Sequence, residues 1–177
     1  PSPNNNYIAY LEDNNGRREY DVKIINASNL DIIDDEIKDS ASNIICSRDS
    51  KFVIYLKKDP VTLINNSVYI HRIGSSSDED KLLYKEIDQE YNLGLYISKS
   101  EQYAYIEIDS TNQNEFRLID LHNPLLEPKL FIKRSDDHLY YLEHIEDEEF
   151  FIRSNLNSPN FKILRTNSYS NIDIENL

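Results

Sequence analysis

Residues 100–120 read SEQYAYIEIDSTNQNEFRLID, and this stretch decides the fold because its pattern recurs along the chain. The aromatic Tyr103 opens a short alternating strand, a polar turn follows, and a second strand begins at Phe116. Two alternating segments separated by a polar turn are typical of a β-hairpin. The stretch is therefore one copy of a repeated hairpin rather than a catalytic motif.

Three other hairpins follow the same plan. The four anchors fall 45, 51 and 47 residues apart, at Tyr7, Phe52, Tyr103 and Phe150. The second strands begin at Tyr20, Val68, Phe116 and Phe161. Short apolar segments lie before or after each hairpin, at Ile44-Ile45, Leu130-Phe131-Ile132 and Ile172 for example. Each repeat therefore contains about four short strands.

Four short strands in a repeat of roughly 40 to 50 residues are typical of β-propeller blades. The sequence predicts an all-β fold, a partial β-propeller of about four blades of four-stranded antiparallel sheet. We expect a single propeller fragment over residues 1–177, with blades at approximately 1–41, 42–86, 87–133 and 134–177. An open arc would expose blade edges near Tyr7 and Ile172, which would favour self-association.

Alternation within the hairpins predicts which side chains fill the cores between blades. These are Ile8, Tyr10, Ile54, Tyr105, Leu118, Leu142, Phe151 and Ile163. Helical periodicity is scarce, and residues 125–132 would hold one helical turn at most.

The charge and composition of the chain limit the classes of molecule that it is expected to bind. The net charge is −13, which disfavours nucleic acid and anionic membranes and would favour cationic peptides. The single cysteine, Cys46, gives no disulfide framework, so a reduced, cytoplasmic location is the simplest expectation. The sequence has no long apolar run. Because the sequence begins at Pro1 and contains no Met, we expect the natural protein to have residues before Pro1. Any targeting segment would lie among those residues.

Several side chains could in principle carry chemistry, and each has a simpler interpretation. The acidic run from Asp31 to Asp39 lacks the spacing and central glycine of a calcium loop, so we expect a solvated edge strand and loop. Residues 75–80 are expected to form a loop that does not bind phosphate, because it lacks the necessary glycines. His71 is expected to be a hydrogen-bonded strand histidine rather than a metal ligand.

The sequence offers no catalytic apparatus. His122, His138 and His144 lie beside acids, as a general base would, but such neighbours arise by chance in so acidic a chain. No Gly-x-Ser-x-Gly nucleophile motif is present. We therefore expect no catalytic residue, no metal site and no cofactor in this chain.

Two stretches carry a resemblance to a known family. Residues 60–86, PVTLINNSVYIHRIGSSSDEDKLLYKE, and residues 138–166, HLYYLEHIEDEEFFIRSNLNSPNFKILRT, resemble the propeller domain of oligopeptidase B in the prolyl oligopeptidase family of serine peptidases. Similar segments continue from about Tyr7 to Thr166. The chain departs from the family pattern at Ile70, where a basic residue is common, and at Ala27-Ser28-Asn29, which replaces a Thr-Gly turn.

The resemblance implies a function. Members of the family pair a seven-bladed propeller with an α/β-hydrolase domain that carries a Ser, Asp, His triad, and oligopeptidase B cleaves short peptides after Lys or Arg. The triad is absent here, so the implied role is to gate access to the hydrolase domain of the same enzyme, in cis or as a separate chain, with short basic peptides as substrates. Whether this chain is part of an enzyme is left open.

The resemblance also implies one functional residue. Arg17 and Arg18 match a paired arginine after the first hairpin turn of the family, and Arg18 would face the hydrolase domain and stabilise its closed state. An exposed arginine on a turn is the simpler alternative. Two other functions stay open for the whole chain, a stand-alone propeller module that binds a protein or peptide, and the remnant of a split gene.

Overall fold

The structure is a computed structural model that describes residues 1–145 and 149–174. Its regular structure there is β-strand apart from one short 3-10 helix, η1 (Ser77–Glu79), so the all-β prediction is confirmed. The strands are β1 (Tyr7–Glu12), β2 (Tyr20–Asn26), β3 (Ile32–Cys46), β4 (Phe52–Lys58), β5 (Asn65–Arg72), β6 (Lys81–Lys85), β7 (Asn92–Ile97), β8 (Tyr103–Asp109), β9 (Asn114–Asp120), β10 (Lys129–Leu130), β11 (Tyr140–His144), β12 (Phe150–Ser154) and β13 (Lys162–Thr166).

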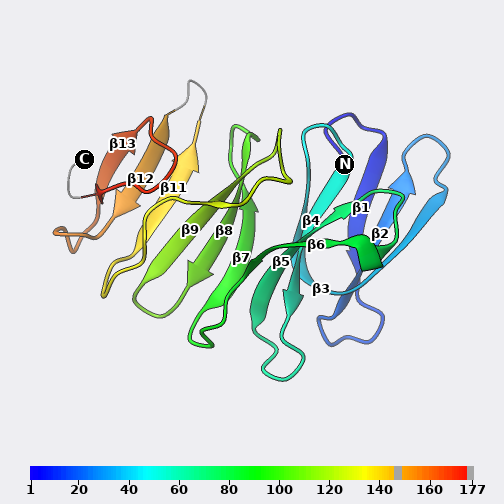
Figure 1. Cartoon of the computed structure of the whole chain (residues 1–177), viewed down its shortest axis with the longest axis horizontal. Coiled ribbons are helices and arrows are strands. Elements are labelled where there is room, and N and C mark those ends of the chain that lie inside the picture. Colours follow the sequence, from blue (N-terminus) through cyan, green and yellow to red (C-terminus); the bar gives the residue numbers. More distant parts are fainter. Residues whose placement is uncertain (146–148, 175–177) are drawn as a thin grey trace.

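The strands form three antiparallel sheets that stand side by side, with β1 and β2 towards one end of the row and β13 at the other (Figure 1). The first sheet has six strands in the order β1-β2-β3-β4-β5-β6. The second has the order β10-β9-β8-β7, and the third has β11-β12-β13. Strands that follow one another along the chain therefore pair with one another within each sheet, as expected for blades.

The repeat anchors are the first residues of strands. Tyr7, Phe52, Tyr103 and Phe150 begin β1, β4, β8 and β12. The expected second strand of the first hairpin begins at Tyr20, as observed for β2, and the other three begin within one to three residues of the predicted positions. Aromatic and β-branched residues at strand starts thus located all four hairpins.

The long strand β3 pairs with strands of two predicted blades. Its first half pairs with β2 and its second half pairs with β4, and its register with β4 shifts between Ser40 and Ile44. Glu36, Asp39 and Asn43 have positive φ angles of 48°, 56° and 77°. Such bulges bend and twist a strand, so the first two predicted blades share one sheet instead of forming two separate ones.

The position of β3 corrects the expectation for the acidic run from Asp31 to Asp39. This run is not an edge strand, because most of it belongs to β3, which lies between β2 and β4. Asp35 and Ile37 are buried. Sequence reasoning failed here because the acids suggested a solvated edge, whereas the Asp35 carboxylate is buried 3.1 Å from the imidazole of His71.

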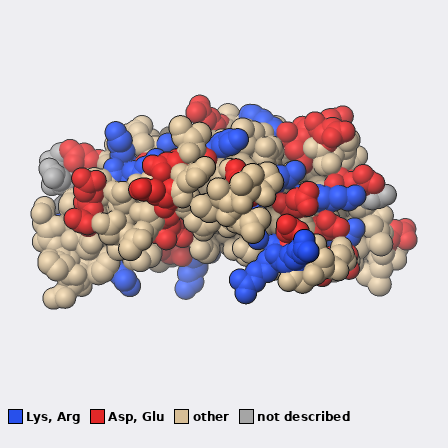
Figure 2. Space-filling view, turned by 90° about the horizontal axis from the view of Figure 1, so that it is seen from below, with Lys and Arg blue, Asp and Glu red and all other residues tan. Residues whose placement is uncertain are grey.

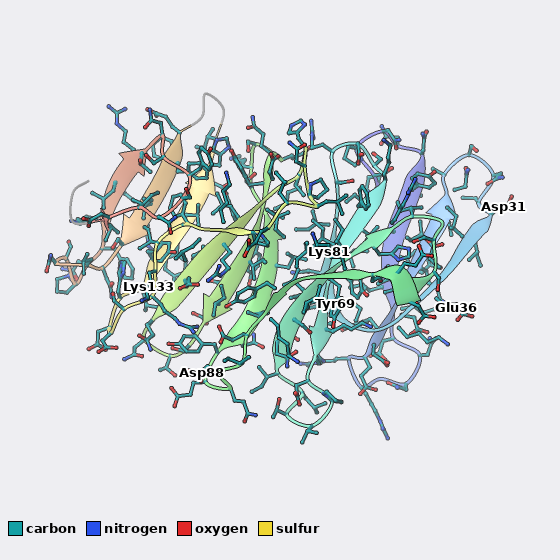
Figure 3. The ribbon with its side chains drawn as sticks, in the orientation of Figure 1. Asp31, Glu36, Tyr69, Lys81, Asp88 and Lys133 are labelled. Atoms are coloured by element: carbon teal, nitrogen blue, oxygen red, sulfur yellow. The ribbon has the colours of Figure 1, made fainter. Side chains whose placement is uncertain are left out.

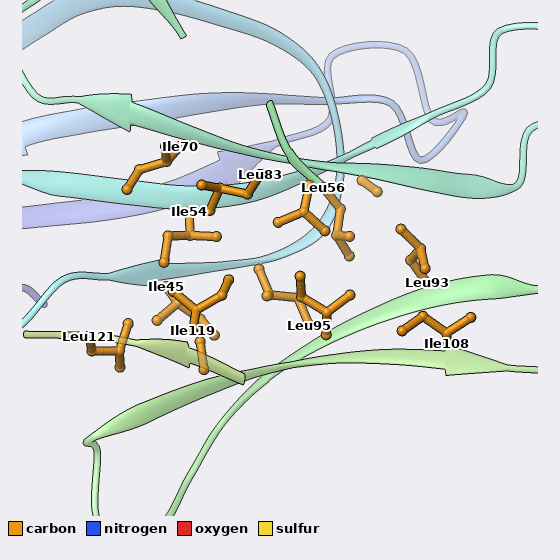
Figure 4. Close-up of a cluster of buried hydrophobic side chains, with 14 of the residues drawn as sticks. Ile45, Ile54, Leu56, Ile70, Leu83, Leu93, Leu95, Ile108, Ile119 and Leu121 are labelled. Atoms are coloured by element: carbon orange, nitrogen blue, oxygen red, sulfur yellow. The ribbon is translucent and has the colours of Figure 1, made fainter. Parts of the chain in front are cut away.

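The described residues form three hydrophobic cores. Val22 and Ile24 pack with Val53 and Tyr55 within the first sheet. The alternate residues of β4, Ile54 and Leu56, point to the opposite side. They enter the large core that the first and second sheets share (Figure 4). A strand buried on both faces loses the polar and apolar alternation of a surface strand, as the sequence VIYL of β4 shows.

A third core lies between the second and third sheets and is rich in aromatic rings. Phe116 and Tyr140 lie with ring centroids 5.2 Å apart, and Phe131 and Phe150 lie 5.0 Å apart. Aromatic pairs contribute more than their buried area alone, at about 0.5 to 1.5 kcal/mol each. This core fixes the third sheet against the second.

The burial predictions succeed inside the arc and fail at its ends. Ile54, Tyr105, Leu118 and Leu142 are buried as expected, and Phe151 is half-buried. Three expectations are wrong, because Ile8, Tyr10 and Ile163 are 36%, 40% and 66% exposed. These side chains lie on the faces of the terminal strand pairs that no other described strand covers.

The carboxyl end of the described chain differs from the four-strand expectation. The third sheet contains three strands, and Ile172 lies outside any strand. The backbone N–H of Ile172 instead donates to the carbonyl of Phe131, and that of Asn171 donates to the carbonyl of Leu130. The predicted strand near Ile172 was wrong because this segment turns back to pair beside β10.

Candidate functional site

A buried charged cluster joins three strands of the first sheet. His71 on β5 is fully buried, and its Nδ1 lies 2.7 Å from Oδ1 of Asp80. Its Nε2 lies 3.1 Å from Oδ2 of Asp35 on β3, an ion pair by distance without hydrogen-bond geometry. The Tyr55 hydroxyl on β4 donates to Oδ2 of Asp80 at 2.7 Å. We call these four residues the His71 cluster.

The electrostatics of the His71 cluster favour a protonated histidine. Burial alone would lower the pKa of His71, but the hydrogen bond and charge of Asp80, together with the nearby charge of Asp35, outweigh burial and raise the pKa above its usual value. The backbone N–H of Gly74 donates to both carboxylate oxygens of Asp35. The imidazole of His71 therefore lies between two carboxylates and has no exposed surface.

The His71 cluster confirms one prediction and corrects another. His71 is a hydrogen-bonded strand histidine, as expected. The segment 75–80, however, is not only a loop, because η1 lies within it and Ser76 caps this short helix by accepting from the N–H of Asp78. Asp80 follows η1 and points inward. Figure 3 labels two neighbours of the cluster, Glu36 on β3 and Tyr69 on β5. The ring of Tyr69 stacks on that of Tyr55, with the ring centroids 5.8 Å apart.

The other three histidines lie in separate surroundings. His138 Nε2 lies 2.9 Å from Ser154 Oγ, and both residues are buried. His144 is likewise buried, with its Nδ1 2.7 Å from Ser100 Oγ. His122 is exposed, and its backbone N–H donates to the Asp120 carboxylate. The two Ser and His pairs resemble parts of a nucleophilic site, but each histidine lies inside a core that substrate cannot enter.

A second charged cluster joins β6 of the first sheet to the segments before β7 and after β10 of the second. The carboxylate of Glu86 is buried and accepts from Arg134 Nη1 at 2.8 Å and from the Tyr84 hydroxyl at 2.9 Å. The guanidinium of Arg134 lies 3.9 Å from the ring centroid of Tyr91. Burial would raise the pKa of Glu86, but these hydrogen bonds lower it below its usual value. Sequence reasoning missed this cluster because Arg134 lies 48 residues from Glu86.

A groove opens between the second and third sheets, with a volume of about 410 Å³. We call it the β7–β11 groove. It is lined by Tyr96, Ile97, Tyr105, Glu107, Phe116, Tyr141, Leu142 and Glu143. Four aromatic rings and two carboxylates among eight lining residues give it both apolar walls and negative charge.

The predicted site residue Arg18 lies in the loop of residues 13–19 between β1 and β2. Its φ is 59°, its side chain is exposed, and its backbone N–H donates to Oδ2 of Asp13 at 3.0 Å. This bond, followed by those from neighbouring N–H groups, lowers the pKa of Asp13. Lys58 Nζ donates to the Arg18 carbonyl at 2.7 Å. The backbone is thus fixed while the guanidinium makes no ion pair with another described residue.

Within residues 1–145 and 149–174, no three His, Cys, Asp or Glu side chains are placed to hold a metal ion. No helix in this part of the chain is long and apolar enough to cross a membrane. On the face shown in Figure 2, carboxylates spread along the whole molecule with lysine and arginine side chains between them.

The sequence profile of the prolyl oligopeptidase N-terminal β-propeller domain matches residues 1–173. Dipeptidyl aminopeptidase BI of Pseudoxanthomonas mexicana is 31% identical over 92% of this chain and 22% of that protein. Protease 2 of Moraxella lacunata is 27% identical over 89% of this chain and 23% of that protein. The chain thus spans less than a quarter of the length of these curated relatives.

Solved structures show the same fold. Oligopeptidase B from Leishmania major superposes with a TM-score of 0.85 at 22% identity, over 94% of this chain and 24% of that one. Oligopeptidase B from Trypanosoma brucei superposes with a TM-score of 0.79 over 90% of this chain and 22% of that one. The predicted propeller fold class is therefore confirmed, and the chain belongs to the prolyl oligopeptidase N-terminal β-propeller family.

Proposed function

We propose that this chain is the substrate-gating propeller portion of an oligopeptidase B-like serine endopeptidase. The observation that supports the proposal most is the match of residues 1–173 to the family profile. In the relatives this propeller is joined to a catalytic hydrolase domain in the same chain. The chain then supplies no catalytic group itself, and the Ser, Asp and His of catalysis belong to the hydrolase domain.

The proposed substrates are short peptides cleaved after Lys or Arg. A rigid arc of blades beside an active site would admit a flexible peptide and exclude a folded protein. The net charge of −13 supports this substrate class, because an acidic surface attracts cationic peptides over distances of about a Debye length, roughly 8 Å at physiological ionic strength. We place the enzyme in the cytoplasm on the basis of the single, half-buried thiol of Cys46.

A chimera tests the proposal. Residues 7–166 would replace the superposed blades of Leishmania major oligopeptidase B, because the two folds align over 94% of this chain. We expect the chimera to cleave a short fluorogenic peptide that ends in Arg, and to leave a folded, Arg-rich protein intact. The chain alone should cleave neither substrate.

Two controls make the result interpretable. A chimera with the catalytic serine of the Leishmania major enzyme replaced by alanine should be inactive, and circular dichroism should show that both chimeras are folded. A folded chimera that cleaves the intact protein as readily as the peptide would disprove the gating role. Activity of the chain alone would disprove the assignment of all catalytic groups to the hydrolase domain.

Arg18 is the proposed contact with the hydrolase domain. In the full enzyme, Arg18→Ala should lower peptide turnover by about tenfold if one charge-assisted bond stabilises the closed state. The turn itself should persist, since the bonds of Arg18 to Asp13 and Lys58 use its backbone only. Arg17→Ala is the matched control from the same turn. Equal turnover and equal closed populations for the two variants would remove Arg18 from the interface.

A further inference from the structure

The β7–β11 groove has its floor and one wall on the second sheet. Tyr105 and Phe116 are buried at its base, whereas Tyr96 on β7 and Tyr141 on β11 are 48% and 44% exposed. Tyr96 lies opposite Tyr105 in the β7 and β8 register. The exposed rings therefore stand at the open side of the groove with apolar surface beneath them.

A glycine lets Tyr96 lie close to a carboxylate. Gly94 is paired with Glu107 across β7 and β8. A Cβ atom at Gly94 would lie 2.7 Å from the Tyr96 ring and 3.2 Å from Oε2 of Glu107, so only glycine leaves this space to both side chains. Burial contributes most to the raised pKa of Tyr96. The charge of Glu107 and a hydrogen bond to its carboxylate raise this pKa further. Tyr96 and Glu107 thus form one polar and aromatic unit.

Among the described residues, no cation forms an ion pair with the carboxylate of Glu107. Burial and the charge of Asp109 raise the pKa of Glu107 above its usual value, and the hydrogen bond from Tyr96 offsets this only in part. No basic residue lines the groove, and no described Lys, Arg or His forms an ion pair with Glu107 or Glu143. Glu143 is fixed through Oε1, which accepts from the N–H groups of Lys99 and His144.

Two other clusters of tyrosine and carboxylate in the same chain do contain a cation. Arg134 pairs with Glu86 at 2.8 Å and lies over the ring of Tyr91. Arg117 pairs with Glu115 at 3.1 Å and lies 4.8 Å from the ring centroid of Tyr84. In both, one guanidinium satisfies a carboxylate and a π face together.

The β7–β11 groove differs because Arg153, which contacts one of its lining rings, Tyr141, forms no ion pair with a described carboxylate. Arg153 lies over Tyr141 at 4.9 Å and over Phe161 at 4.6 Å, on the third sheet. The face of Tyr96 and the carboxylate of Glu107 are left for a group from outside. A cation bound there would have the same two partners as Arg134 and Arg117 have.

We propose that the β7–β11 groove binds a Lys or Arg side chain of a peptide, with Glu107 as its carboxylate partner and Tyr96 as its aromatic one. The aliphatic part of that side chain would cover Tyr105 and Phe116, and Glu143 would add a second negative charge. A volume of about 410 Å³ is within the range of about 300 to 1,000 Å³ that small-ligand sites occupy. The proposal deepens the proposed function, on which the choice of a peptide ligand rests.

The test measures binding without hydrolysis, so that it can fail separately from the proposed function. The full chain is titrated with acetyl-Ala-Arg-Ala-amide and with the same peptide carrying neutral citrulline, at physiological salt to screen long-range attraction. Binding is followed by NMR shifts of the tyrosine rings. We expect the arginine peptide to bind at least about tenfold more tightly than the citrulline peptide, since bonds between charged groups are the stronger kind. Equal affinities would overturn the proposal.

Substitutions locate the site. Glu107→Gln should weaken binding of the arginine peptide by about tenfold or more. Glu90→Gln, which removes the same charge from an exposed carboxylate outside the groove, should leave the affinity unchanged. Gly94→Ala should also weaken binding, because the new methyl group displaces the Tyr96 ring. If Glu107→Gln and Glu90→Gln bind the peptide equally well, the site is not this groove.

A further readout separates a binding role from a structural one. Since burial disfavours the charged form of Glu107, the ligand-free Glu107→Gln variant should melt no lower than the unsubstituted chain. Addition of the arginine peptide should lower the pKa of Glu107, measured from its side-chain carboxyl shift. An unchanged pKa at saturating peptide would show that the cation binds elsewhere and would overturn the proposal.

Discussion

Replacing His71 with Gln is expected to lower the free energy of unfolding by about 3 to 5 kcal/mol, as removal of one partner from a buried ion pair does. His71 has no exposed surface, and the side chains of Asp35 and Asp80 are only 5% and 3% exposed. Glutamine would leave two buried carboxylates without a cation between them. The measurement is equilibrium unfolding in urea at pH 6, where His71 carries its proton.

The same variant should lose a pH dependence. Because the folded pKa of His71 is raised above the usual 6.5, its stabilisation is complete below pH 6.5 and is lost as the pH rises through the folded pKa. The unsubstituted chain should therefore lose stability over that range, whereas His71→Gln should not. The exposed His122→Gln is the matched control and should keep the profile.

A second substitution tests whether repulsion between the two carboxylates causes the loss of stability. Asp35→Asn in the His71→Gln background removes one of the two repelling charges, so the double variant should recover part of the lost stability. Stability of His71→Gln within about 0.5 kcal/mol of the unsubstituted chain would show that the cluster does not hold β3, β4 and β5 together.

Replacing Tyr140 with Ala is the other large expected effect, a loss of about 3 to 5 kcal/mol, as found for large aromatic side chains deleted from cores. Tyr140 on β11 is fully buried and packs against Phe116 and His138. Its hydroxyl accepts from the N–H of Phe116 at 2.8 Å and donates to the carbonyl of Ile132 at 2.8 Å. The change leaves both a cavity and unpaired backbone groups.

Two further variants divide this effect. Tyr140→Phe keeps the ring and removes only the hydroxyl, so it should cost about 1 to 3 kcal/mol for the backbone groups left without a partner. Tyr141→Ala changes the next residue, which points to the opposite face and is 44% exposed, and should cost less than either. Thermal unfolding measures all three. If Tyr140→Ala and Tyr141→Ala melt alike, the third core does not stabilise the third sheet.

The repeat in the sequence was enough to predict the hairpins, because a strand start depends on local residues. Tyr7, Phe52, Tyr103 and Phe150 each begin a strand. Burial could not be predicted equally well at the ends of the arc, since alternation tells which side chains share a face but not what covers that face. Ile8 and Ile163 therefore follow the strand pattern and are nevertheless exposed.

The charged clusters were beyond sequence reasoning for a different reason. Asp35, His71 and Asp80 meet only because of the registers of β3 and β5 on the strand between them, β4, and because Asp80 turns inward after η1. Gly94 and Glu107 meet through the β7 and β8 register. In a chain with 32 acidic residues, no local pattern marks the few that become buried. The histidine prediction succeeded because a buried strand histidine needs a hydrogen-bond partner of some kind.

Because β3 is shared, the boundary between the first two sequence repeats does not coincide with a boundary between sheets. A boundary between residues 41 and 42 cuts this strand in the middle, where its pairing passes from β2 to β4. Excising or duplicating one sequence repeat at that boundary would leave a half strand without one of its neighbours. Between the second and third sheets, by contrast, no strand is shared. The natural place to shuffle blades in this arc is therefore the connection from β10 to β11.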